Sequence, residues 1–258
     1  MAEVLMLKRM IPPLILVLGV GAAVFYFNQD TRHDVMMRHE AEFATIRQQL
    51  ARLASVVRPP PPPPRTIPST GCNGVPPGAR PFKFDRGDAA GTNTGLVTQA
   101  QLRDPAGPAG EWSVIEPDLA RYVAATAPGY RPTEADEERA SEEFGRWVQA
   151  MANVRYVVVV WTDRSEGFAQ NGPWDDTLGV EAHIADLRTG KSLCFVHAAG
   201  GLGDRGRILY AYPGNGGPGA REESASEAVD SILRSAGKTE LEKKLNGLGR
   251  GHFDLDTE

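Results

Sequence analysis

A polar, glycine-rich loop carries the side chains best suited to contact a ligand. Trp174 stands beside Asp175 and Asp176, and His183 follows shortly after. An exposed tryptophan next to carboxylates could line a groove for a sugar or peptide, whose hydroxyl groups would donate to the carboxylates. In the alternative interpretation, the tryptophan is tucked over a sheet edge and the acids are solvated. These four residues form the predicted binding site.

Two cysteines, Cys72 and Cys194, are the only ones in the chain. In an oxidising compartment they would join in a disulfide. In the alternative, Cys72 belongs to a disordered linker and lies too far from Cys194 for a bond. The expected hairpin register places His183 opposite Cys194, a pair that could activate a thiolate, although no third orienting group is visible. The same register places His183 and His197 on opposite faces, where they cannot share a metal ion.

Other motif matches predict no cofactor. Gly201, Gly203 and Gly206 form a G-x-G-x-x-G pattern, but the residues that follow reach Pro213 too soon to form the helix that dinucleotide binding requires. No metal-binding or nucleophile-elbow motif occurs, so we predict no metal or catalytic residue. The net charge of −5 argues against nucleic-acid binding, which normally uses a basic surface.

The elements that must position these residues form an α+β domain, predicted over residues 75–246. Residues 155–161 are β-branched and aromatic on both faces, which indicates a central strand. Residues 178–186 and 191–197 form a hairpin in which Asp186 pairs with Lys191 and Gly190 turns the chain. A further strand is expected over 208–212. Helices are expected at these places: 117–127, from Thr133 to Asn153, 224–236, and from Thr239. The architecture is a small, mainly antiparallel sheet with packed helices, followed by a flexible tail over residues 247–258.

An uncharged apolar run precedes this domain. It begins at Met10, ends at Phe27, and follows a short tail, residues 1–9, that includes Lys8 and Arg9. Its length is about that of a membrane-spanning helix, and the positive charges before it favour a cytoplasmic N-terminus. We therefore predict a transmembrane signal anchor over residues 10–27. A signal peptide cleaved near Ala23 is the alternative.

Two segments separate the anchor from the domain. Residues 28–58 are expected to form a helical stalk with a heptad pattern, which indicates a parallel coiled coil and thus a homodimer. Its seam residues are Met36, Phe43, Ile46, Leu50 and Leu53. The alternative is an amphipathic helix that folds back onto its own globular domain or lies on the membrane. Residues 59–74 are proline-rich and predict a stiff linker.

This layout predicts a single-pass membrane protein whose C-terminal domain is extracytoplasmic, in a periplasm-like compartment. An anchor, a stalk, a spacer and a domain without catalytic motifs favour an envelope protein that binds a partner. An exported hydrolase or glycan-binding enzyme of the cell envelope is the alternative, and it rests on Trp174, Asp175, Asp176 and His183.

Overall fold

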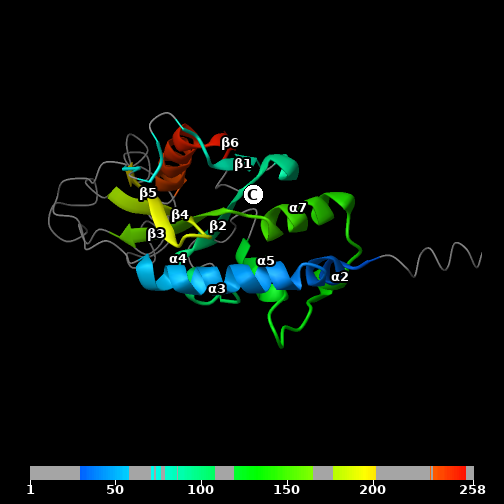
Figure 1. The fold of residues 1–258 in the computed structure, drawn as a ribbon. Coiled ribbons are helices and arrows are strands. Elements are labelled where there is room, and N and C mark those ends of the chain that lie inside the picture. The colour runs from blue at the N-terminus through cyan, green and yellow to red at the C-terminus, as the bar shows by residue number, and fades with distance from the viewer. Residues whose placement is uncertain are drawn as a thin grey trace, which may run out of the picture.

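The protein combines helices with a four-stranded, mostly antiparallel sheet, as expected for an α+β domain (Figure 1). The strands are ordered β2-β3-β4-β5, and only β2 and β3 are parallel. Their bounds are β2 Thr94–Thr98, β3 Tyr156–Arg164, β4 Thr177–Asp186 and β5 Lys191–Gly201. This computed structural model describes residues 30–57, 71–72, 74–76, 79–85, 87–107, 119–164, 177–201, 233 and 235–253.

Strand β3 lies inside the sheet, between β2 and β4. Its four consecutive valines, Val157 to Val160, are fully buried, because alternate side chains enter two different hydrophobic clusters. A strand covered on both faces accepts β-branched residues at every position, which explains why the predicted central strand is found here.

The β4–β5 hairpin departs from the expected register after its turn. Asp186 pairs with Lys191 as predicted, and Gly190 has a φ of 67°. A β-bulge then shifts the pairing between Ala185 and Ile184, so that Leu193 is the extra residue on β5. Since a shift of one residue moves side chains to the opposite face, every predicted pair beyond the bulge changes.

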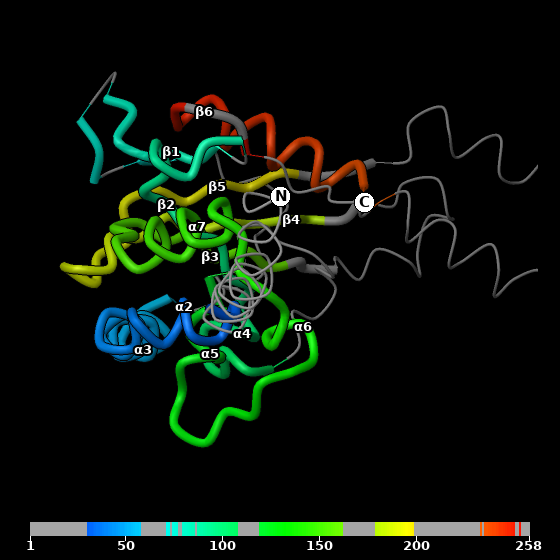
Figure 2. Tube along the Cα trace, turned by 90° about the vertical axis from the view of Figure 1, so that its right-hand side faces the viewer, coloured from blue at the N-terminus to red at the C-terminus, as the bar shows by residue number. Residues whose placement is uncertain are grey.

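One face of the sheet is covered by helices from the first half of the chain (Figure 2). These helices are α2 Arg32–Met37, α3 Glu40–Val56, α4 Gln99–Arg103 and α5 Leu119–Ala125. The single helix expected from Thr133 to Asn153 is divided into α6 Glu134–Glu137 and α7 Glu142–Ala152, because Ser141 caps a new helix by accepting from the N–H of Phe144. Residues of α7 join the same hydrophobic cluster.

Helix α3 belongs to this folded body. The seam residues of the expected stalk, Met36 on α2 and four on α3, are buried against other parts of the same chain. The four residues on α3 are Phe43, Ile46, Leu50 and Leu53. The ring of Phe43 stacks on Tyr122, and Arg47 donates to the carbonyl of Val123 at 3.1 Å. The apolar stripe is thus used within one chain, which corresponds to the alternative interpretation of a helix that folds back onto its own domain. Within one chain, residues of α3 and of the sheet therefore share one hydrophobic cluster.

The other face of the sheet is covered by a helix over residues 235–248 and a small parallel ladder (Figure 2). The ladder pairs β1 Lys83–Asp85 with β6 Arg250–His252, and the one-turn 3-10 helix η1 Ala89–Gly91 follows β1. Gly237 lies within the helix, although the sequence indicated a helix end there. Residues 250–253 are ordered as well, contrary to the expected loose tail, because Phe253 stacks on Phe84 with ring centroids 4.8 Å apart.

The last residues of the expected linker, 71–74, include a segment that pairs with the outer edge of β5. Gly71 exchanges two backbone hydrogen bonds with Phe195, of 3.0 and 2.8 Å, and Gly74 donates to the carbonyl of Leu193 at 3.1 Å. Cys72 and Cys194 are joined by a disulfide at this edge. The segment therefore satisfies part of an otherwise open strand edge and is held there covalently.

Several predicted elements lie outside the described residues. They are the anchor over 10–27, the proline run over 59–64, the strand over 208–212 and the first part of the helix over 224–236. Within the described part of the chain, no helix has both the length and the apolar character needed to cross a membrane.

Candidate functional site

The structure describes only one of the four predicted binding residues. His183 lies in the middle of β4, whereas Trp174, Asp175 and Asp176 fall outside the described residues. These three residues belong to the connection between β3 and β4 in the sequence.

The bulge in the hairpin brings both of its histidines to the same face of the sheet. His183 pairs with Phe195 and Glu181 pairs with His197, whereas Cys194 faces the opposite side beside Ile184. The expected His183–Cys194 pair and the expected separation of the two histidines are therefore both wrong. Their common cause is the extra residue, Leu193, which the alternating pattern of the sequence does not reveal.

A buried carboxylate connects three strands on this face. Glu181 accepts a hydrogen bond of 2.7 Å from the indole N–H of Trp161, and its other oxygen lies 3.1 Å from Nδ1 of His197. Glu181 is only 1% exposed and His197 only 7%. Lys244, on the helix of the opposite face, donates to the backbone carbonyl of His197 at 2.6 Å. Both oxygens of the buried carboxylate thus have a polar partner, as burial demands.

His183 lies beside this cluster in an aromatic environment. Its ring centroid is 4.8 Å from that of Trp161 and 5.0 Å from that of Phe195. Burial lowers the pKa of the imidazole to about 4. Ser192 Oγ lies 3.4 Å from Nδ1, and Nε2 is buried without a hydrogen-bond partner in the described residues. A neutral imidazole between aromatic rings acts as a packing residue at neutral pH.

The cluster formed by Trp161, Glu181 and His197 can do one thing chemically, which is to orient the ring of His197. A carboxylate at Nδ1 fixes the ring and favours the tautomer with its proton on Nδ1, the arrangement found beside general bases. Sequence reasoning missed Glu181 because its partner, His197, becomes its neighbour only through the bulge. The one available signal was a glutamate between the apolar residues Val180 and Ala182 of the predicted strand.

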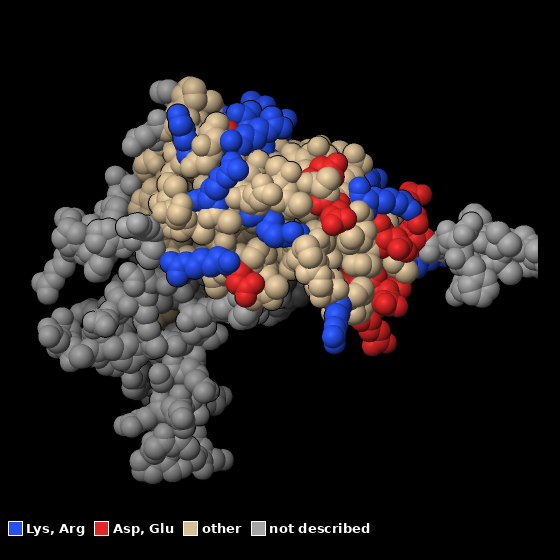
Figure 3. All heavy atoms as spheres, turned by 60° about the horizontal axis from the view of Figure 1, so that its bottom comes forward, with Lys and Arg blue, Asp and Glu red and all other residues tan. Residues whose placement is uncertain are grey.

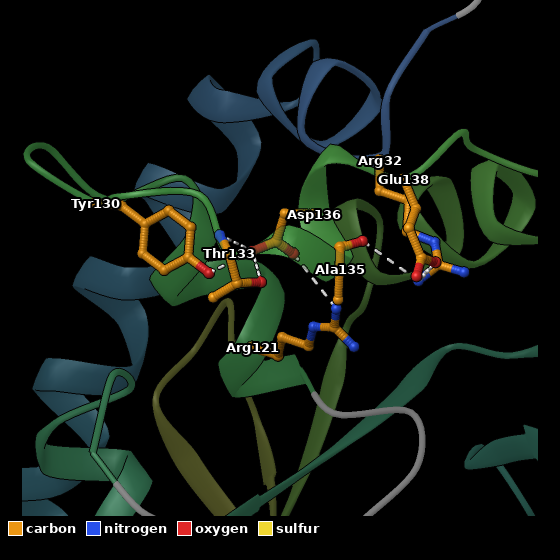
Figure 4. Close-up of polar contacts among 7 residues, drawn as sticks. All are labelled: Arg32, Arg121, Tyr130, Thr133, Ala135, Asp136 and Glu138. Atoms are coloured by element: carbon orange, nitrogen blue, oxygen red, sulfur yellow. Dashed lines mark hydrogen bonds and ion pairs between the residues drawn. The ribbon is translucent and has the colours of Figure 1, made fainter.

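A second buried carboxylate, Asp136, lies on α6 among several hydrogen-bond donors (Figure 4). It accepts hydrogen bonds from the Tyr130 hydroxyl at 2.7 Å, from the Thr133 hydroxyl at 2.7 Å and from the Thr133 N–H at 3.0 Å. Arg121, on α5, donates to its other oxygen at 3.3 Å. Burial raises the pKa of this carboxyl, but the hydrogen bonds from Tyr130, Thr133 and Arg121 outweigh that effect and lower it to about 2.

The bonds around Asp136 fix the start of α6. The Thr133 and Asp136 pair is the capping box that their spacing predicts, and the carboxylate is used entirely by neighbouring donors. Arg32 extends this polar region to α2, since it donates to the Ala135 carbonyl at 3.4 Å and pairs with Glu138 at 2.8 Å (Figure 4). This second cluster holds helices together.

Together, the fold and these clusters define a disulfide-linked α+β domain with a buried Glu181–His197 pair. Among the described residues, no group of three or more His, Cys, Asp or Glu side chains is arranged to hold a metal ion. Comparisons with protein-family models, with curated proteins and with solved structures gave no match for this chain.

Proposed function

We propose that this chain is a membrane-anchored envelope protein whose exported α+β domain binds a partner. The observation that supports export is the disulfide between Cys72 and Cys194, whose sulfur atoms come from positions 122 residues apart. Disulfides of this structural kind persist in oxidising compartments and are rare in the cytoplasm of most organisms. The uncharged run over residues 10–27 supplies the anchor in this proposal.

The site geometry favours binding over catalysis as the role of the domain. Both oxygens of Glu181 are already used, and the side chain is 1% exposed. Such a carboxylate can only orient His197, and His197 is itself only 7% exposed, whereas a catalytic acid or base must reach a substrate.

The compartment is tested by a reporter and by thiol chemistry. A reporter that is active only in the cytoplasm, fused after Glu258, should remain silent, and a reporter active only outside it should give signal. Alkylation of the denatured, unreduced protein isolated from cells should label neither cysteine. Cytoplasmic reporter activity together with two labelled cysteines would overturn the proposal of export.

Partner binding is tested on the two large apolar side chains that are exposed in the described residues. Met37 is 37% exposed and Val56 is 59% exposed. A photoactivatable residue at either position should give a product of discrete mass in growing cells, and the same residue at the exposed, polar Gln48 serves as the control. If all three positions give only the uncrosslinked chain, these exposed apolar side chains do not lie at a partner interface.

A hydrolase or glycan-binding enzyme is the second candidate, and one observation favours it. The carboxylate of Glu181 orients His197 on β5, and β5 pairs with β4, the strand that follows Trp174, Asp175 and Asp176 in the sequence. Purified wild-type protein and the His197→Gln variant would be incubated with cell-wall fragments. Release of soluble fragments by the wild type alone would favour the enzyme over the binding protein.

A further inference from the structure

The folded domain begins almost immediately after the predicted anchor. The Asp30 carbonyl accepts a hydrogen bond of 3.0 Å from the N–H of Ala140, and the N–H of Arg32 donates to the Glu138 carbonyl at 2.8 Å. Between them, Thr31 forms an antiparallel bridge with Arg139. The first described residues are therefore attached to the chain between α6 and α7.

Side chains strengthen this attachment. Arg32 pairs with Glu138 at 2.8 Å, and Arg38 pairs with Asp30. Thr31 caps α2 and forms a capping box with Asp34. Because both the backbone and the side chains of residues 30–38 are engaged, the orientation of α2 is fixed relative to α6 and α7.

The distance from the anchor to this attachment is short. The apolar run ends at Phe27, three residues before Asp30. A fully extended chain spans at most about 3.6 Å per residue, so Asp30 lies within roughly 10 Å of the end of the predicted span. We propose that the end of the domain formed by α2, α6 and the start of α7 faces the bilayer surface. This inference rests on the proposed membrane anchor.

The charge of this end indicates how it meets the bilayer. Its exposed acidic side chains include Asp34, Glu134, Glu137, Glu138, Glu142 and Glu143, and they outnumber the exposed arginines Arg38 and Arg139 beside them. Figure 3 shows carboxylates gathered at this end of the molecule, with some basic groups among them. Anionic headgroups repel carboxylates. The short tether, and not attraction to anionic lipid, therefore holds this face near the bilayer.

The remainder of the domain extends away from the bilayer along α3. Helices α2 and α3 follow one another along nearly one line (Figure 1). At 1.5 Å per residue, the path from Arg32 to Val56 covers roughly 35 Å. Val56 thus marks the end of the domain far from the membrane, and Glu137 marks the near end.

Energy transfer to the bilayer tests this orientation. The full-length chain, with its native disulfide intact, would carry a donor dye on a new cysteine, Glu137→Cys in one variant and Val56→Cys in the other. Both positions are exposed. The chains would be placed in vesicles of phosphatidylethanolamine and phosphatidylglycerol that contain an acceptor-labelled lipid. We expect several-fold stronger transfer from position 137 than from position 56.

A lengthened tether provides the matched control. A flexible Gly-Ser insertion of about ten residues between Asn28 and Gln29 should reduce transfer from position 137, because the domain can then move away from the lipid. Raising the salt concentration should not reduce transfer in the original chain. Salt screens electrostatic attraction, and the carboxylates of this face are repelled by anionic headgroups, so no attraction is lost. Equal transfer from both positions, or no effect of the insertion, would overturn the inference.

Extraction with alkaline carbonate separates this inference from the proposed function. If the chain stays in the vesicles but transfer from the two positions is equal, the anchor is supported and only the proposed orientation is overturned. A chain that is released by carbonate has no anchor, and that result would overturn both proposals.

Discussion

Glu181 and His197 lie opposite each other on β4 and β5, with the carboxylate Oε1 3.1 Å from the imidazole Nδ1. The other carboxylate oxygen accepts the indole N–H of Trp161 on β3. One side chain thus links three of the four strands by polar contacts inside an apolar face of the sheet. Such a group fixes the strand register, because any slip would leave a buried polar atom without a partner.

Replacing Glu181 by leucine should destabilise the domain. The change leaves the Trp161 N–H and His197 buried without their acceptor, which costs about 2–4 kcal/mol of unfolding free energy. Glu181→Gln, which keeps an acceptor for the indole, should lose less. Urea unfolding followed by tryptophan fluorescence measures both variants. Glu137→Leu, on an exposed position, is the control, and a Glu181→Leu variant as stable as this control would contradict the prediction.

Asp136 should stabilise the fold at neutral pH and lose this effect in acid. Its folded pKa is about 2, below the ordinary value of 3.8, so the folded state binds its proton more weakly than the unfolded state does. The ionised carboxylate therefore contributes stability above about pH 4, on the order of 2 kcal/mol, which disappears as the pH falls toward 2. Asp136→Asn should be less stable than wild type at pH 7, and the difference should shrink below pH 4. A constant difference would show that the charge plays no part.

His183 should reduce stability in a different pH range. Burial lowers its folded pKa to about 4 from 6.5. Between these two pH values the unfolded state binds a proton at His183, whereas the folded state does not. Stability then falls as the pH drops from about 6.5 toward 4, by about 2 kcal/mol after allowance for partial solvation. His183→Leu should remove this slope. Unfolding free energies at closely spaced pH values measure it, and parallel curves for the two proteins would exclude the effect.

Local sequence rules predicted the elements whose partners are close in the chain. The valine-rich run forms a buried strand, and Gly190 adopts a positive φ in the turn next to the Asp186–Lys191 pair. Thr133 and Asp136 form the capping box at the start of α6. In each case the residue types select one conformation almost without regard to the remainder of the fold.

The hairpin bulge and the packing of the C-terminal residues could not be predicted, because both are decided by contacts made in the folded domain. The bulge at Leu193 leaves no mark in the alternating pattern, yet it decides which side chains meet His183 and His197. Phe253 orders the C-terminal residues by stacking on Phe84, a position 169 residues earlier, as the chain numbering shows. Such pairings are set by tertiary packing, which a single sequence does not disclose.

The apolar stripe of α3 is the hardest case, because two structures require the same residues. A stripe at heptad spacing serves a coiled-coil seam, and it equally serves a helix docked on its own domain. The structure uses it for docking: Leu50 is fully buried and Ile46 is 4% exposed within one chain.

A charge introduced into this stripe distinguishes the two uses. Leu50→Asp buries a carboxylate in the core and removes a leucine side chain, so we expect a loss of about 4 kcal/mol or more and an unfolded domain. The matched control is Gln48→Asp, which lies on the exposed side of the same helix and should unfold like the wild type. Circular dichroism and urea unfolding measure stability, and chemical crosslinking measures association. If α3 instead formed the seam of a dimer, Leu50→Asp would abolish crosslinking between chains while the domain stayed folded, and the docking of α3 would be contradicted.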